Sequence, residues 1–388
     1  MNVRKQAAAL LLCLSLAASL VACQRPGATE GQTGQQTEQA LQTDPDHFYE
    51  EVEEGLLIDA VVEHPEGNVT PKVYVGRKPA FNQERLQAFL SQVGDPVVEV
   101  KVDRTEDQLY NFDGVCANGG HAIILQELEQ NSRNFSMSYN NLKADRWYGA
   151  VLSLDTGDYI DVSGTSNNTY LLTEPKNFSF ATEQEAETAV REMLQLLDVG
   201  NLELKRTLYL DHEALATAER SELIKGKNAE KGDEIPSKES WTEADDAYMF
   251  DFNCAYDGIP MLTTTWSSQT EGYAPVNITV RYNRVGITYL VVQGPLNFDQ
   301  VAEEPASITS AAEALAVAKE VTQNVVSSYE RVIDRVSLRY YVEQDRDPLL
   351  LKPCWEVAIR QKDVVLYSGE VRDEYMYVVV DALTGKEK

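Results

Sequence analysis

A chain of 388 residues is long enough for two or three domains of ordinary size, and its 43% hydrophobic and 9% aromatic residues exclude a disordered chain. The 62 Asp and Glu residues outnumber the 34 Lys and Arg residues, which gives a net charge of −28. A surface of this charge repels nucleic-acid phosphates and anionic lipid headgroups, so we expect no nucleic-acid partner. The simpler interpretation of the acidic excess is that it keeps an extracytoplasmic protein soluble.

Residues 1–22 have the plan of a secretory signal peptide. Arg4 and Lys5 precede an apolar core that is short for a membrane-spanning helix. The core ends in Leu-Val-Ala-Cys, which resembles the lipobox of bacterial lipoproteins. The resemblance implies transfer of diacylglycerol to the sulfur of Cys23, cleavage before Cys23, and usually acylation, for example with palmitate, of the new amino group. Two or more acyl chains give a stable anchor, so we expect a protein on the extracytoplasmic face of the cell membrane. The alternative is an ordinary signal peptide followed by an unmodified cysteine.

Residues 23–46 contain Gly, Gln, Thr, Pro and Glu and almost no large apolar groups. This composition predicts a flexible tether. A random coil of this length spans roughly 27 Å, so the folded body can stand clear of the bilayer.

Residues 47–175 are predicted to form an N-terminal α+β domain. A helix is expected in NQERLQAFLSQV, where Asn82 is a suitable N-cap and Leu86, Phe89 and Leu90 recur on one helical face. The run VVEVKVD alternates valines with charged residues, a pattern typical of a half-buried strand. HAIILQEL, NFSMSY and WYGAVLSLDTGDYIDV predict further strands, separated by glycine-containing turns.

From residue 176 onward, one order of predicted elements occurs twice: a helix followed by three strands. The first copy, residues 176–300, begins with a capping box of Thr182 and Glu185 ahead of an apolar helical stripe. Its strands are predicted in NLELKRTLYL, AYMFDFNCAYDGIP and APVNITVRYNRVGITYLVVQ. A densely charged insertion, residues 211–246, interrupts this copy.

The second copy, residues 305–388, repeats this order in shorter form. A helix is predicted to begin at Thr309 in ITSAAEALAVAKEVTQNVV, and RVSLRYYV, PCWEVAI and YMYVVVDALTGK are predicted strands. We therefore predict an α+β fold of antiparallel sheets, each covered by a helix, with a tandem duplication in the C-terminal half. The alternative is that an α+β chain produces such an order by coincidence.

The segments ITSAAEALAVAKE, CWEVAI and YVVVDALTGKEK resemble the PepSY module of extracytoplasmic bacterial proteins. That family ends in a strand, an Asp, a short spacer and Thr-Gly, which here are Asp381 and Thr384-Gly385. The first copy departs from this ending, with Asn283 and Gly286 and no Thr-Gly. The pair resembles the tandem modules of membrane-anchored regulators of the Yyc type, which restrain a sensor kinase. The whole chain is similar to uncharacterised lipoproteins of anaerobic, clostridial-type Gram-positive bacteria. These resemblances imply an envelope protein such as a sensor kinase as partner, and they supply no catalytic residue.

Cysteines and histidines offer little material for catalysis. Cys116 and His121 are the only thiol and imidazole that lie close together in the sequence. A Cys–His nucleophile needs the two side chains in contact, and a turn leading into a strand is the simpler interpretation of this segment. Cys254 and Cys354 lie in apolar, strand-like runs where we expect buried thiols, with one disulfide among the three distal cysteines left open.

No metal site or cofactor is predicted. Asp155, Asp158 and Asp161 are spaced unlike the ligands of an EF-hand loop, so a turn and an exposed strand face are expected there. His47, His64 and His212 are scattered along the chain. Phosphate-binding loops, H-E-x-x-H and G-x-S-x-G are absent from the sequence.

The insertion 211–246 is expected to contain a solvated helix, from about Glu213 to Lys227, and a loop. A charged excursion of this kind is usually only a solvated face, but it is also a place where a partner docks. Trp241 is the candidate anchor for such a partner.

The leading hypothesis is a non-enzymatic, lipid-anchored protein that binds or regulates another cell-envelope protein. The alternative is a solute- or glycan-binding lipoprotein that uses some of its 19 Tyr and 4 Trp residues to line a pocket. A hydrolase built on Cys116 and His121 is a third hypothesis. A pocket binder should gather aromatic side chains in one cleft, whereas a regulator should present a flat surface or a sheet edge.

The lipid anchor predicts the behaviour of a single substitution. Cys23→Ser removes the sulfur that accepts diacylglycerol, so this variant should be released from the membrane or remain uncleaved, as judged by fractionation and the mass of the N-terminal peptide. Unchanged membrane retention of a processed Cys23→Ser protein would contradict the anchor.

Overall fold

The computed structural model describes residues 46–388, apart from residues 66–68, 78–81, 107–108, 128–134, 142, 144–147, 149–171, 227–237, 239, 263–275, 295–296, 344–347 and 366–370. The expected signal peptide, Cys23 and nearly all of the tether lie outside the described residues, as do Asp155, Asp158 and Asp161. Residues 44–388 belong to one unit of the chain, in which the described strands form two sheets.

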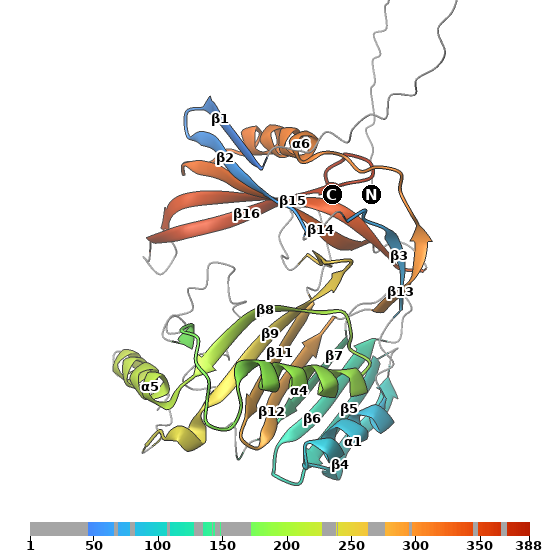
Figure 1. Ribbon diagram of the computed structural model, residues 1–388, viewed down its shortest axis with the longest axis vertical. Helices are drawn as coiled ribbons and strands as arrows, with labels where there is room; N and C mark the ends of the chain where they lie inside the picture. The colour runs from blue at the N-terminus through green and yellow to red at the C-terminus, as the bar shows by residue number, and fades with distance from the viewer. Residues whose placement is uncertain are drawn as a thin grey trace, which may run out of the picture. The chain divides into compact units, whose positions relative to one another are not determined.

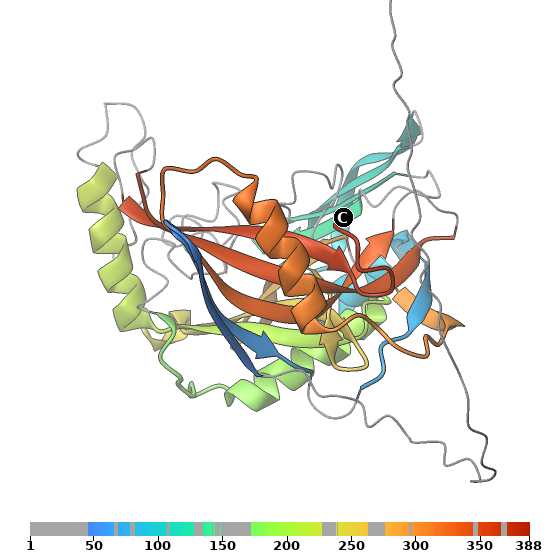
Figure 2. The same ribbon diagram turned by 90° about the horizontal axis from the view of Figure 1, so that it is seen from above.

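The first sheet has seven strands in the order β1-β2-β14-β15-β3-β13, with β16 also paired to β15. Their bounds are β1 His47–Glu53, β2 Leu56–Glu63, β3 Val73–Arg77, β13 Asn297–Glu303, β14 Arg331–Glu343, β15 Leu350–Val365 and β16 Val371–Asp381. The pairs are antiparallel except for β2 with β14, which is parallel. Helix α6, Ala311–Gln323, covers one face of this sheet and lies across β14, β15 and β16 (Figures 1 and 2).

The second sheet has nine strands in the order β10-β9-β11-β12-β7-β6-β5-β4, with β8 also paired to β9. Their bounds are β4 Val97–Glu106, β5 Leu109–Cys116, β6 His121–Glu127, β7 Phe135–Asn140, β8 Leu202–Leu210, β9 Ala247–Tyr256, β10 Ile259–Pro260, β11 Asn277–Asn283 and β12 Gly286–Gln293. Helices α1, Gln83–Gln92, and α4, Glu183–Leu196, contact each other and cover one face of this sheet (Figure 1). A short 3₁₀ helix, η3, spans Glu243–Asp245, and helix α5 spans His212–Gly226.

The predicted helix starts are confirmed for α1 and α4. The Asn82 side chain accepts a hydrogen bond from the Arg85 backbone N–H, and Thr182 and Glu185 form the expected capping box. Helix α6 begins at Ala311, two residues later than predicted, with Ser310 as its N-cap. The Thr309 N–H instead donates to the carbonyl of residue 382, which ties the start of α6 to the chain after β16.

The strand VVEVKVD differs from its prediction in burial. Val98 and Val100 are 66% and 47% exposed, although the alternation of the run predicted that its valines face the core. Two register shifts in the pairing of β4 with β5, at Val97/Glu99 and Val100/Val102, break the two-residue periodicity on which that expectation depended. β4 is also the edge strand of the second sheet, so neither valine has a neighbouring strand on its outer side among the described residues.

The two sheets cut across the boundaries predicted near residues 175 and 300. Strands β1, β2 and β3 pair with strands from the C-terminal part of the chain, whereas β4 to β7 join the second sheet through the pair β7–β12. Pairing between distant segments depends on which apolar faces are buried together, and local patterns do not encode it. The fold class is α+β, as predicted. A helix followed by an antiparallel meander occurs at both α4 and α6, and the tandem duplication stays a prediction.

Four aromatic side chains join the sheets, and we refer to them as the aromatic junction. The Tyr256 ring, at the end of β9, lies 5.7 Å from Tyr74, 5.4 Å from Phe298 and 6.5 Å from Tyr340, which belong to β3, β13 and β14. The Phe298 N–H donates to the Tyr256 hydroxyl at 3.3 Å, and the Tyr74 hydroxyl donates to the Asp257 carboxylate. Tilted and edge-on aromatic pairs of this kind stabilise a contact beyond the area they bury.

The Asp-x-x-Thr-Gly ending is a turn that the carboxylate of Asp381 holds in place. Its Oδ1 accepts hydrogen bonds from the N–H groups of Leu383 and Thr384, both at 2.9 Å, and its Oδ2 accepts one from the Tyr341 hydroxyl at 2.7 Å. Gly385 adopts φ +68°, a left-handed conformation that glycine tolerates best. Burial raises the pKa of Asp381, but the hydrogen bonds from Tyr341 and the backbone outweigh it, so the pKa of this carboxyl is lowered overall.

This turn predicts a measurable loss of stability. Asp381→Ala leaves three donors without their acceptor at a site that is 1% exposed, so the free energy of unfolding should fall by about 3 kcal/mol at neutral pH in urea titrations. Asp381→Asn keeps Oδ1 and should lose less. Because the pKa of Asp381 is lowered, its contribution should be present above the unfolded value of about 3.9 and should disappear as the pH falls through the folded value. Equal stability of parent and Ala variant at neutral pH would contradict this assignment.

Candidate functional site

The structure separates Cys116 from His121. His121 pairs with Val115 across the β5–β6 hairpin, so Cys116, the next residue, faces the opposite side of the sheet. Cys116 is buried, and burial together with the charges of Asp95 and Asp113 raises the pKa of its thiol to about 12. The exposed His121 ring lies against Asp113 instead, with Nδ1 2.9 Å from Oδ1. These two residues therefore do not form a nucleophile–base pair.

The other two distal cysteines are buried, as predicted. Cys254 and Cys354 are free thiols, so the disulfide that the sequence left open is not formed among the three. Burial raises the pKa of Cys254 to about 12 and also raises the pKa of Cys354. Thiols in such surroundings are poor nucleophiles and metal ligands.

One group of residues in the described part of the chain has the spacing of metal ligands: Asp211, His212 and Asp246. Its carboxylates already have other partners. Asp211 Oδ1 accepts from the N–H groups of Glu213 and residue 214 at the start of α5, at 3.0 and 3.3 Å, and its Oδ2 accepts from Lys176. Asp246 accepts from the His212 N–H at 2.9 Å and lies 2.8 Å from its ring Nδ1. We assign this group to helix capping. His47 and His64 lie at the exposed surface, beside Asp59 and Asp46 respectively.

Trp241, the candidate anchor for a partner, is half-buried. Its indole Nε1 donates to Glu219 on α5 at 3.0 Å, its ring lies 5.8 Å from that of Tyr148, and the Lys238 ammonium lies 4.7 Å from its centroid. Trp241 and Tyr148 border a cavity of about 310 Å³ beside the β11–β12 turn. Helix α5 has the expected position in the insertion, but Leu215 on its inner face packs on the second sheet, so α5 is only partly solvated.

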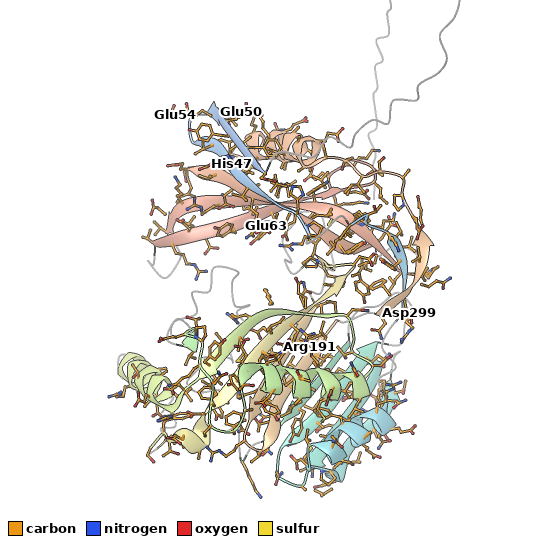
Figure 3. All side chains as sticks on the ribbon, viewed as in Figure 1. His47, Glu50, Glu54, Glu63, Arg191 and Asp299 are labelled. Atoms are coloured by element: carbon orange, nitrogen blue, oxygen red, sulfur yellow. The ribbon has the colours of Figure 1, made fainter. Side chains whose placement is uncertain are left out.

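The main candidate site is a cleft of about 280 Å³ between the two sheets, which we call the inter-sheet cleft. It lies on the side of the first sheet opposite α6, where Figure 3 labels Glu63. Six charged side chains line it, four from the first sheet and two from β8: Glu63, Arg335, Arg339, Glu356, Glu203 and Lys205. Their formal charges sum to zero, in contrast to the strongly acidic chain as a whole.

The wall formed by the first sheet is a connected network of ion pairs and hydrogen bonds. Glu63 Oε2 accepts from the Ser337 hydroxyl at 2.6 Å and lies 3.2 Å from Arg339 Nη2 and 3.9 Å from Arg335 Nε. Arg339 Nε also lies 3.5 Å from a carboxylate oxygen of Glu356, which is only 5% exposed. Carboxylates and guanidinium groups held in this way keep their positions when a ligand binds.

The wall formed by β8 carries charges without such partners. Glu203 and Lys205 have no ion pair within 4 Å among the described residues. Burial raises the pKa of the half-buried Glu203, opposed by the charge of Arg339. Lys205 is exposed, but the protein on both sides of the cleft lowers the pKa of its ammonium. A side chain in an open cleft has protein on both sides and water at its mouth, which accounts for both observations.

A β-bulge sets the position of Lys205. The pairing of β8 with β9 shifts between Leu204 and Arg206, so Lys205 falls outside the regular alternation of the strand. Arg206 on the same strand pairs with Asp251, with Nε 3.0 Å from Oδ2, and the Thr279 hydroxyl donates to the other oxygen of Asp251 at 2.7 Å. Of the two cations at the bulge, Arg206 is thus engaged by its own sheet and Lys205 is turned to the cleft.

Sequence reasoning did not single out any residue of the inter-sheet cleft. NLELKRTLYL indicates a strand with leucines on one face, and Glu203 and Lys205 then look like ordinary solvent-facing positions. The bulge and the opposite wall, which comes from strands more than a hundred residues away in the chain, give these positions their setting. The feature of the sequence that could have indicated this site is the presence of both acidic and basic residues in the strand NLELKRTLYL.

Comparison with known proteins adds a fold relationship. No protein-family model and no curated protein matches the chain. The chain is similar to the crystal structure of an uncharacterized protein from Eubacterium rectale ATCC 33656, with a TM-score of 0.54 and 16% sequence identity over 89% of this chain and 93% of that one. At this identity the likeness shows a shared fold alone. Within the described residues, no helix is long and apolar enough to cross a membrane.

Proposed function

We propose that this protein is a non-enzymatic lipoprotein, anchored to the cell membrane through Cys23, that binds another envelope protein such as a sensor kinase by way of the edge of β4 that no described strand covers. The observation that carries the proposal is that a ten-residue edge strand exposes two valines. Proteins usually blunt the edges of their sheets, and a long edge that retains exposed apolar side chains is suited to strand addition by a partner.

The two halves of β4 differ in character. The first half carries Val98 and Val100, whereas the second half carries charges that pair along the strand, with Arg104 Nη1 3.1 Å from Glu106 Oε1. A partner strand that adds to this edge would bury the valines and match the charged half with side chains of opposite sign. The charged half and the two bulges limit the register of such an addition and discourage unspecific pairing.

The aromatic side chains support a protein partner over a glycan. Most described tyrosines, including Tyr74, Tyr139, Tyr248, Tyr256 and Tyr340, belong to the hydrophobic core. The inter-sheet cleft has one aromatic residue in its described lining, Tyr377. Trp241 and Tyr148 meet at the smaller group of buried residues beneath α5, where Trp241 is held by Glu219 and Lys238.

The lipid anchor increases the effect of a modest affinity. A module held at the membrane meets membrane partners at a high effective concentration, so contacts along a single strand are enough for regulation. The gain in effective concentration is limited to protein partners in the same membrane, which are the partners that the expected location provides.

Site-specific photo-crosslinking tests the proposal. A benzoylphenylalanine residue at position 98, in the lipidated chain in host membranes, should yield an adduct with a second protein, identified by mass spectrometry. The matched control places the same residue at position 326, where Val326 is 101% exposed in the turn that follows α6 and lies outside any strand. The proposal fails if position 98 gives no more adduct than position 326, or if its adduct is a dimer of this chain.

A further inference from the structure

The inter-sheet cleft contains one unpaired charge of each sign on its β8 wall. Glu203 and Lys205 both line the cleft and have no ion-pair partner among the residues that the structure describes. Glu203 is half-buried and Lys205 is exposed at the edge of the cleft. An unpaired carboxylate partly removed from water is costly, and proteins tolerate it where a ligand supplies the missing partner. A ligand that satisfies both residues must carry a positive and a negative group.

The opposite wall can assist an anionic group. Arg335 is held loosely, with Nε 3.9 Å from Glu63, whereas Arg339 is shared between Glu63 and Glu356 at 3.2 and 3.5 Å. Arg335 therefore has more donors available for a ligand than Arg339. Glu63 and Glu356 have already been matched by Arg339 and Ser337, so Glu203 is the carboxylate best able to receive a new cation.

Size and net charge narrow the class of ligand further. A volume of about 280 Å³ is just below the usual range of about 300–1,000 Å³ for small-molecule sites, which favours a small ligand over a long polymer. The six charged residues sum to zero, so a ligand with a large net charge would leave an uncompensated charge in the cleft. A small molecule with one charge of each sign meets both conditions.

We propose that the inter-sheet cleft binds a small zwitterion of the size of an amino acid or dipeptide, with its carboxylate at Lys205 and Arg335 and its ammonium at Glu203. This site is separate from the β4 edge and is a second function of the chain. Because its walls belong to different sheets, the ligand would hold the two sheets together. Burial lowers the pKa of Lys205 and raises that of Glu203, and opposite charges on a ligand would counteract both effects.

The experiment uses the full chain and a panel of probes: the common free amino acids and the dipeptide alanyl-alanine, first by thermal shift and then by calorimetry on the best binder. We expect at least one probe to raise the melting temperature. The same probe should slow acylation of Lys205 by acetic anhydride relative to that of the exposed Lys101, as followed by mass spectrometry, because this ratio cancels the reagent that the probe's own amine consumes. N-acetylation or amidation of that probe, each of which removes one charge, should weaken binding about tenfold or more.

Two variants and a control complete the test. Lys205→Met and Glu203→Gln should each weaken binding of the best probe about tenfold, whereas Lys101→Met, at an exposed position on β4, should leave it unchanged. Circular dichroism checks that all three variants are folded. The proposal is overturned if no probe in the panel shifts the melting temperature, or if blocked and unblocked probes bind equally well. If the probe binds in the cleft but position 98 gives no specific crosslink, only the β4 proposal is contradicted.

Discussion

The contact between the two sheets is the constraint on which the rest of the molecule depends. Helix α6 covers one face of the first sheet, and helices α1 and α4 cover one face of the second (Figure 1). Tyr74, Tyr256, Phe298 and Tyr340 bring the two sheets together. The backbone reinforces this contact, because the N–H of Leu262 donates to the carbonyl of Tyr340 at 2.8 Å. Aromatic rings bury a large area with few rotatable bonds, so a junction of this kind holds two layers at small entropic cost.

Polar strand faces line both sides of the inter-sheet cleft, and their charged side chains need partners. In the first sheet, Glu63 and Glu356 pair with Arg339 of the same sheet. On β8, Arg206 pairs with Asp251, but Glu203 and Lys205 have no ion pair in the described structure. One wall of the cleft therefore has paired charges and the other has unpaired charges. This difference distinguishes the cleft from an ordinary gap between layers.

Local patterns predicted the parts of this structure that depend on neighbours in sequence. Asn82 and the Thr182–Glu185 capping box mark helix starts because caps are made within four residues, and the buried thiols of Cys254 and Cys354 follow from the apolar runs around them. The two-sheet arrangement, the exposure of Val98 and the setting of Lys205 were not predictable in this way. Each depends on a bulge or on a strand from a distant part of the chain, and a bulge leaves no periodic trace in a single sequence.

The spacing of the sheets is the quantity that tests this account most directly. Spin labels at position 196 on α4 and position 371 on β16, both exposed, report it by pulsed electron resonance, since the native Cys116, Cys254 and Cys354 are buried thiols with raised pKa values. We expect one narrow distance distribution in the ligand-free protein. The distribution should broaden in Tyr256→Ala, because that substitution removes the ring at the centre of the aromatic junction. A broad or bimodal distribution in the parent protein, or an unchanged narrow one in Tyr256→Ala, would contradict it.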